Sequence, residues 1–224
     1  MSEHRGIRFR IGDAFPGNDQ VARWMVVCAM ALNDLLLVNR WLLPRLEEKI
    51  ESEAYENVYL ARLAASHLYE IANFLERSDR IPRVQEFIAA LDDDVREAYD
   101  RVCALGPHSQ TQLAKQVRRA RNRFFHYVEL VPQAEDREIL KAAIEAHADT
   151  MGEIRDEGNP LDAFRATFAD DIAVELSFPD ENTELEDVLK EITDHIGAFL
   201  KFAFDVLPRY VQRLPSDTWE YIDA

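Results

Sequence analysis

Apolar positions recur every three to four residues along most of the chain, which is the spacing of one face of an α-helix. Seven stretches share this spacing, over residues 19–39, 53–77, 83–91, 92–105, 109–130, 134–155 and 184–214. Because helices patterned in this way bury their apolar stripes against one another, we predict an all-α bundle of about six to seven helices. The helix over 19–39 is apolar almost all round, so we expect it to be central or partly in a dimer interface.

Residues with strong conformational preferences mark the predicted helix ends. Asn18 or Asp19 can cap the first long helix by accepting from its unpaired N–H groups. Pro44 suits a break after that helix or a first-turn position in the following segment, and Pro208 is expected to kink or shorten the last helix. Gly106 is expected to close the helix over 92–105.

Two segments have a strand-like pattern. In residues 163–178, alternating apolar residues flank Ala169-Asp170-Asp171, which predicts a small β-hairpin inserted in the bundle. A turn is expected before it, at Asp156-Glu157-Gly158-Asn159-Pro160. A short strand is also expected near Ile7–Ile11, and the pattern does not decide whether the tail from Asp217 onward is ordered.

Composition fits a folded protein: 47% of residues are hydrophobic, and there are only 7 Gly and 9 Pro. No repeat or linker interrupts the pattern, so we expect one domain over residues 1–224. A net charge of −16 argues against a general nucleic-acid coat protein but allows one local basic patch. Cys28 and Cys103 lie in apolar helical patterns, which favours buried thiols over a disulfide.

The first residues are charged and lack the apolar core of a signal peptide. The most apolar segment, Trp24 to Leu43, is interrupted by Asn33, Asp34, Asn39 and Arg40. We therefore expect it to be too polar for a transmembrane helix and the protein to be cytoplasmic, without a membrane partner.

Residues 107–128 contain no Asp or Glu, in a chain where 42 of 224 residues are acidic. On a helical wheel, one stripe of this segment is apolar and is expected to face the core, formed by Leu113, Val117, Ala120, Phe124 and Val128. The opposite face is polar, formed by Lys115, Arg118, Arg119, Asn122 and His126. Arg121 lies at the border, about 140° from His126 at 100° per residue, and can lean towards either face.

The motif Arg121-Asn122-x-x-x-His126, late in a long amphipathic helix, resembles the R-x4-6-H signature of HEPN domains (higher eukaryotes and prokaryotes nucleotide-binding). The resemblance implies a HEPN-like core over about 19–155 and a homodimer whose motifs face each other. Many members are metal-independent RNases of toxin–antitoxin, abortive-infection (phage-defence) and CRISPR-associated systems, and others only bind. Toxin members often carry a Tyr two residues after the His; here Val128 holds that position and Tyr127 comes one residue early.

These residue types suit RNA cleavage by attack of the RNA's own 2′-hydroxyl, which needs no metal or cofactor. His126 is the type of group that transfers protons near neutral pH. Arg121 can stabilise charge on the phosphate, and Asn122 can orient His126 or bind a phosphate oxygen. The remaining candidates would hold the RNA backbone or stack on a base: Lys115, Arg118, Arg119 and Tyr127.

A second interpretation stays open, in which the basic face is paired with acids of neighbouring helices. The chain would then be a non-catalytic interaction protein, such as a defence-system accessory, whose acidic surface binds a protein partner such as an antitoxin or mimics nucleic acid. It predicts Arg121 in intramolecular salt bridges and His126 away from any cleft. His67, three residues before Glu70, is either a second partner of the Arg121–His126 site or a hydrogen-bonded core histidine. No Glu-x-x-His motif or Gly-rich phosphate loop is present in the sequence, so neither a di-iron site nor a phosphate loop is predicted.

Overall fold

The computed structural model describes residues 5–47, 54–125, 141–142, 144–145, 154–155, 165–166 and 185–223. Within these ranges the helices are α1 (Ile11–Ala14), α2 (Gln20–Glu47), α3 (Ala54–Ser78), α4 (Pro82–Ala89), α5 (Asp93–Cys103), α6 (Gln112–Phe125) and α9 (Leu185–Gln212). The strands are β1 (Arg5–Phe9), β2 (Ile154–Arg155), β3 (Arg165–Ala166) and β4 (Trp219–Asp223). The predicted all-α bundle with a small antiparallel strand pair is confirmed.

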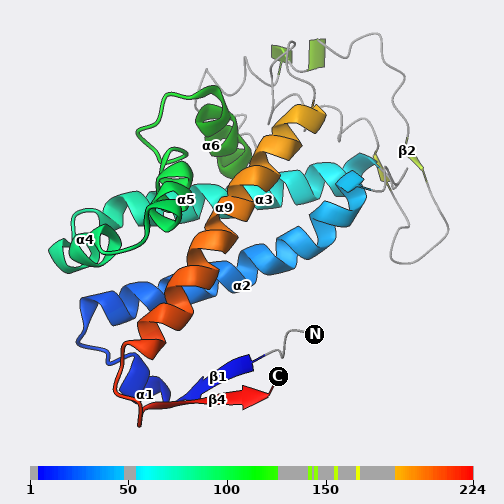
Figure 1. The fold of residues 1–224 in the computed structure, drawn as a ribbon. Helices are drawn as coiled ribbons and strands as arrows, with labels where there is room; N and C mark the ends of the chain where they lie inside the picture. Colours follow the sequence, from blue (N-terminus) through cyan, green and yellow to red (C-terminus); the bar gives the residue numbers. More distant parts are fainter. Residues whose placement is uncertain are drawn as a thin grey trace.

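The core lies where α9 crosses α2, α3 and α5 (Figure 1). Apolar residues of α9 recur at helical spacing, and Ile192, Ile196, Phe199 and Phe202 are fully buried. The ring of Phe202 lies 6.0 Å from that of Trp24, 5.3 Å from Tyr99 and 6.3 Å from Phe199, measured between centroids. Rings from α2, α5 and α9 therefore join these helices, and α6 packs on the far side of α3 from α2 (Figure 1).

Pro44 does not break the chain after the first long helix, contrary to the prediction, whereas Pro208 lies inside the last helix, as the predicted range of 184–214 implied. Asp19 caps α2 as expected, because its Oδ1 accepts from the N–H of Ala22 at 2.9 Å. However, α2 continues through Pro44 to Glu47, and α9 contains Pro208. A proline inside a helix costs about 3 kcal/mol. Burial of apolar residues in the same terminal turns, such as Leu42 in α2 and Val211 in α9, offsets that cost.

The two chain ends form an antiparallel sheet beside α1 (Figure 1). Strand β1 pairs with β4, with Ile7 opposite Tyr221 and Phe9 opposite Trp219. The N-terminal strand was expected at Ile7–Ile11 and lies at Arg5–Phe9, because α1 begins at Ile11. The tail, which the sequence left undecided, is an ordered strand.

The second strand pair differs from the expected hairpin. Strand β3 pairs with β2, so that Ile154 faces Ala166 and Arg155 faces Arg165. The helix expected over 134–155 is therefore wrong at its end, since residues 154–155 are extended. Alternation in the sequence identifies an extended segment but not its partner, which explains the error. Residues 167–184, where the other strand of the hairpin was expected, lie outside the described ranges.

Cys28 is buried, Cys103 is half-buried, and both are free thiols, as predicted. Burial raises the pKa of both thiols, that of Cys103 to about 12. The segment Gln20–Leu42 is long and apolar enough to cross a membrane by length and composition, so the prediction that it is too polar was wrong by that criterion. A core helix of a soluble protein meets the same criterion, and the fold is compatible with a soluble protein.

Candidate functional site

A capping residue fixes the start of helix α6, and an apolar stripe packs the helix against α3. The Oγ1 of Thr111 accepts from the N–H of Ala114 at 3.2 Å, and the Thr111 carbonyl accepts from the N–H of Lys115 at 3.1 Å. Leu113, Val117 and Ala120 are buried against α3, which confirms the first half of the predicted core stripe. The side chain of Phe124 and all of Val128 lie outside the described residues.

The structure describes five of the seven predicted site residues. Arg119 and Asn122 are exposed, and Lys115, Arg118 and Arg121 are partly buried. His126 and Tyr127 fall outside the described residues, so their roles remain predictions. The structure therefore tests where Arg121 points and what surrounds it, but not its distance from His126.

Arg121 leans towards α3. Its Nε donates to Glu70 Oε1 at 2.7 Å, and its Cζ lies 5.8 Å from the ring centroid of Tyr69. Its Nη1 also donates to Asn122 Oδ1 at 3.3 Å. Asn122 therefore contacts Arg121, which makes it a group that positions the guanidinium. The Arg121–Glu70 pair is the kind of intramolecular salt bridge that the interaction-protein interpretation predicts.

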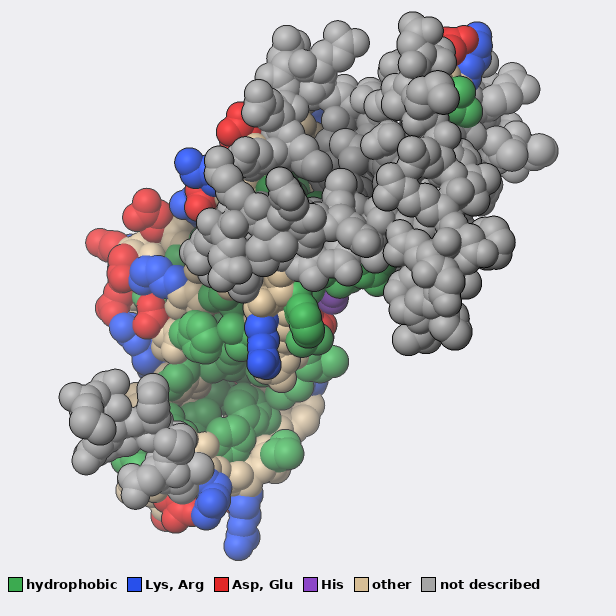
Figure 2. All heavy atoms as spheres, turned by 90° about the vertical axis from the view of Figure 1, so that its right-hand side faces the viewer, with side chains coloured by type: hydrophobic (Ala, Val, Ile, Leu, Met, Phe, Trp, Pro, Cys, Tyr) green, Lys and Arg blue, Asp and Glu red, His purple; other side chains and the backbone are tan. Residues whose placement is uncertain are grey.

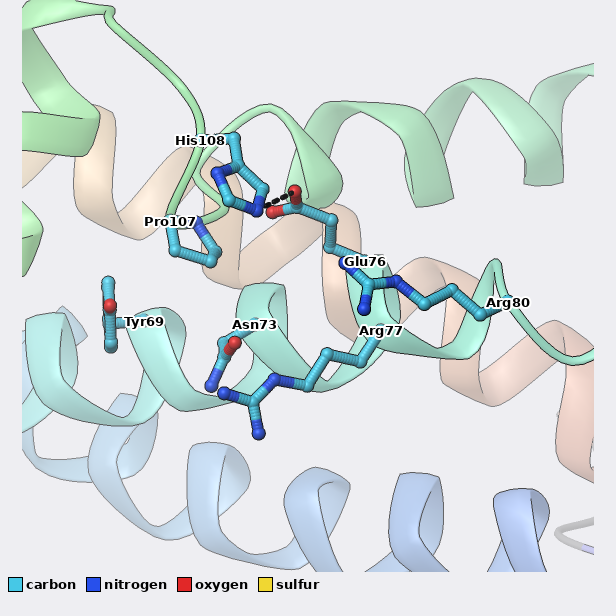
Figure 3. A pocket seen from close by; sticks show the side chains of 7 residues that line it. All are labelled: Tyr69, Asn73, Glu76, Arg77, Arg80, Pro107 and His108. Atoms are coloured by element: carbon cyan, nitrogen blue, oxygen red, sulfur yellow. Dashed lines mark ion pairs between the residues drawn. The ribbon is translucent and has the colours of Figure 1, made fainter.

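A cavity of about 560 Å³ lies next to this pair, between α3 and the loop joining α5 to α6 (Figure 3). It is lined by Tyr69, Asn73, Glu76, Arg77, Arg80, Pro107 and His108. Tyr69 both lines the cavity and faces Arg121, so the two features form one surface. Sequence reasoning missed the cavity because its residues come from the end of one predicted helix and from a connector. The signal that could have found it is Arg77 and Arg80 at helical spacing, with His108 opening the acid-free run.

The α5–α6 loop contacts α6 through Pro107 and α3 through Gly106 and His108. Arg118 Nη1 donates to the carbonyl oxygen of Pro107 at 2.8 Å. His108 Nε2 lies 3.6 Å from Glu76 Oε1, and Figure 3 shows the two side chains pointing at each other. At Gly106, an added Cβ would overlap the carboxylate of Glu76, so glycine allows this close approach. One wall of the cavity is therefore held in place by its own residues.

The cavity carries uncompensated positive charge. Among the described residues, no carboxylate forms an ion pair with Arg77 or Arg80, whereas Arg83 pairs with Asp19 and Arg101 with Asp194. Figure 3 shows Arg77 extended along α3 towards Asn73. Glu76 is the one carboxylate in the lining, and it faces His108. In a chain of net charge −16, the lining therefore has a local excess of positive charge.

His67 does not join this site in the structure. Its Nδ1 lies 3.9 Å from Asp34 Oδ2 of α2, so it bridges α2 and α3 instead of contacting Arg121. Glu70, three residues after His67, instead contacts α6 through its ion pair with Arg121. Across the described ranges, no group of three or more His, Cys, Asp or Glu side chains is arranged to hold a metal ion.

Comparisons of this chain with protein-family models, with curated proteins and with solved structures find no match.

Proposed function

We propose that the chain is a HEPN-like RNA-binding protein that holds the phosphate backbone of single-stranded RNA in the arginine-lined cavity and along α6. The observation that carries the proposal is the position of Arg77 and Arg80. They line a cavity beside Arg118 and Arg121, and neither has a carboxylate partner in the described part of the chain. Leaving two arginines unpaired in so acidic a protein is readily explained by an anionic ligand.

The lining suits a nucleotide as well as a bare phosphate. Arginine presents a planar fork of donors that matches two phosphate oxygens. Tyr69 offers a ring on which an unpaired base can stack, and Asn73 offers both a donor and an acceptor. The volume of about 560 Å³ lies within the range of ordinary small-molecule sites. Single-stranded RNA supplies both the phosphates and the unstacked bases that such a lining would bind.

Cleavage is a further step of the same proposal. Arg121 would stabilise charge that develops on the phosphate, and His126 would transfer the proton of the attacking 2′-hydroxyl. Asn122 would hold the guanidinium of Arg121, as its 3.3 Å contact indicates. The resemblance to HEPN domains adds a homodimer and a place in a toxin–antitoxin or phage-defence system, and the charged first residues add a cytoplasmic location.

The test uses fluorescence anisotropy with a labelled single-stranded RNA in buffer containing EDTA. Replacing Arg77 and Arg80 with Ala together should weaken binding at least tenfold. Replacing the carboxylate-paired Arg83 and Arg101 with Ala removes the same charge elsewhere and should weaken it less than about threefold. Equal losses in the two double variants, or no RNA binding at low salt, would overturn the proposal. Loss of EDTA-resistant cleavage in His126→Ala, with binding retained, would support the catalytic step.

A non-catalytic interaction protein is the second candidate, and one observation favours it. Arg121 is already engaged by Glu70 at 2.7 Å within the same chain, so it serves at least partly to hold α6 on α3. In this interpretation an acidic surface binds a protein partner such as an antitoxin. His126→Ala would then leave every RNA assay unchanged, and the wild-type protein would not bind RNA even at low salt.

A further inference from the structure

Helix α2 presents a row of large apolar side chains to solvent. Val26, Met30, Leu37 and Trp41 are 38%, 62%, 60% and 56% exposed, respectively. The opposite side of the helix is buried, with Met25, Leu35 and Leu42 at zero exposure. Figure 2 shows a patch of hydrophobic side chains gathered on this side of the molecule. A row of this kind on a helix that already fills the core indicates a contact outside the chain.

The row is symmetric about its own midpoint. If α2 is paired with an antiparallel copy of itself, and the two-fold axis passes between Asn33 and Asp34, Val26 faces Trp41 and Met30 faces Leu37. Viewed down the helix axis at 100° per residue, all four apolar side chains lie within about 30° of the direction of the point midway between residues 33 and 34. They span about 23 Å of helix, which is roughly four turns. Apolar residues would then meet apolar residues on both sides of a polar centre formed by Asn33 and Asp34.

We propose that two copies of the chain associate through antiparallel α2 helices about this two-fold axis. At the centre, the amide of Asn33 donates to the carboxylate of the partner's Asp34. Asp34 is 60% exposed and lies 3.9 Å from His67, so it retains acceptor capacity on the solvent side. An isologous interface uses the same patch on both subunits. The row meets this condition, because its apolar residues lie in pairs at equal distances from the axis.

An apolar groove beside the row enlarges the contact surface. It has a volume of about 610 Å³ and lies between α2, the end of α9 and the β1–β4 sheet. Its thirteen lining residues include Phe9, Met30 and Val211, and none is charged. Row and groove, with Asp34 at the centre of the row, together give sixteen residues per subunit, which is fewer than the roughly 20–30 of a standard interface, so the contact is a small one.

Charge favours a second copy over a lipid surface as the occupant. The net charge of −16 would be repelled by anionic lipids, and interfacial helices that bind such lipids carry a Lys- and Arg-rich polar face. Two copies would also repel each other in general, yet the groove itself carries no carboxylate. Among the row and groove residues, Asp34 at the centre is the one carboxylate, and it accepts from the partner's Asn33 in the proposed arrangement.

This interface is separate from the site on α6. In Figure 1, α2 and α6 lie on opposite sides of α3, against which both pack. The proposed dimer therefore leaves the arginine-lined cavity open on each subunit. It differs from the motif-to-motif dimer that the HEPN resemblance implies, and the two arrangements can be separated by experiment.

The test is sedimentation velocity of the full chain over a range of concentrations. The wild type should be a dimer, and the double variant Met30→Glu/Leu37→Glu should dissociate at least a hundredfold more readily. Both positions are about 60% exposed in the subunit, so the variant should keep its fold, which circular dichroism and thermal unfolding check. The charge-matched variant Gln85→Glu/Gln110→Glu alters exposed positions elsewhere and should remain dimeric.

Cross-linking fixes the geometry. Asn33→Cys should give a covalent dimer with a short bismaleimide, and Asn122→Cys on α6 should not. The native thiols react slowly because burial raises the pKa of both Cys28 and Cys103. A monomeric wild type, a dimer unaffected by the Met30→Glu/Leu37→Glu change, or cross-linking only at position 122 would each overturn the proposal. Co-sedimentation of the wild type with phosphatidylcholine vesicles, lost in that same variant, would also overturn it in favour of a lipid surface.

Discussion

Replacing Glu70 with Gln removes the carboxylate that holds Arg121 while keeping the size of the side chain. The proposed function predicts a gain in RNA affinity from this change, because a phosphate at Arg121 then competes with one fewer negative charge. A unit charge about 6 Å from a phosphate in a water-like dielectric contributes about 0.7 kcal/mol. That energy corresponds to roughly threefold tighter binding.

The same substitution should cost little stability. The pair joins side chains that are 31% and 47% exposed, and exposed ion pairs contribute about 0.2–1 kcal/mol. For a chain of this size, the melting temperature should therefore fall by no more than about 4 °C. The assays are anisotropy with single-stranded RNA and thermal unfolding of the same samples.

Asp217→Asn is the matched control for Glu70→Gln. It also removes one exposed carboxylate, but next to the β1–β4 sheet at the opposite end of the bundle from α6 (Figure 1). Its RNA affinity should stay within experimental error of the wild type. Equal affinities for Glu70→Gln and Asp217→Asn would refute the reasoning. A stability loss above about 2 kcal/mol in Glu70→Gln would show instead that the carboxylate mainly holds α6 on α3.

Three further predictions concern the scaffold. Phe202→Ala empties a fully buried site among aromatic rings and should cost about 3–5 kcal/mol in urea unfolding; a loss below about 1 kcal/mol would contradict the core described here. Tyr99→Phe removes a hydroxyl that donates to Asp79 Oδ1 at 2.8 Å and should cost about 1–2 kcal/mol, so an unchanged urea midpoint would count against that hydrogen bond. Lys201 donates a hydrogen bond to the Asp94 carboxylate and so lowers the pKa of that group in the folded state. The pair therefore stabilises the fold at pH values above the pKa that Asp94 has in the unfolded chain. This contribution is lost as the pH falls through the lower pKa of the folded state. On acidification below about pH 4, the free energy of unfolding of Asp94→Asn should therefore fall less than that of the wild type. An identical fall in both proteins would contradict the pairing of Lys201 with Asp94.

The local sequence pattern predicted most of the helices, because each helix buries a stripe of apolar residues that recur every three to four positions. Helices α3, α4 and α5 begin and end within about two residues of their predicted positions, which is the usual scatter of helix ends. The cap at Asp19 was predictable for the same reason, since it depends on neighbouring residues alone. The course of α2 past Pro44 was not predictable from the local pattern, because a proline more often ends a helix than continues it.

The candidate site was only partly predictable for a related reason. The wheel placed Arg121 at the border of α6, and a side chain of that length is directed by whatever carboxylate lies within reach. That carboxylate is Glu70, which lies 51 residues earlier on α3. The cavity requires Arg77 and Arg80 to meet the loop at His108, a contact between separate segments that no local pattern encodes.

The most direct test of the central claim is the salt dependence of single-stranded RNA binding. Each phosphate contact made by a cation contributes about 0.7 to the slope of log affinity against log salt concentration. If Arg77 and Arg80 each hold a phosphate, the variant with both replaced by Ala should show a slope smaller than that of the wild type by about 1.4. A variant slope equal to that of the wild type would contradict the claim that this cavity binds the RNA backbone.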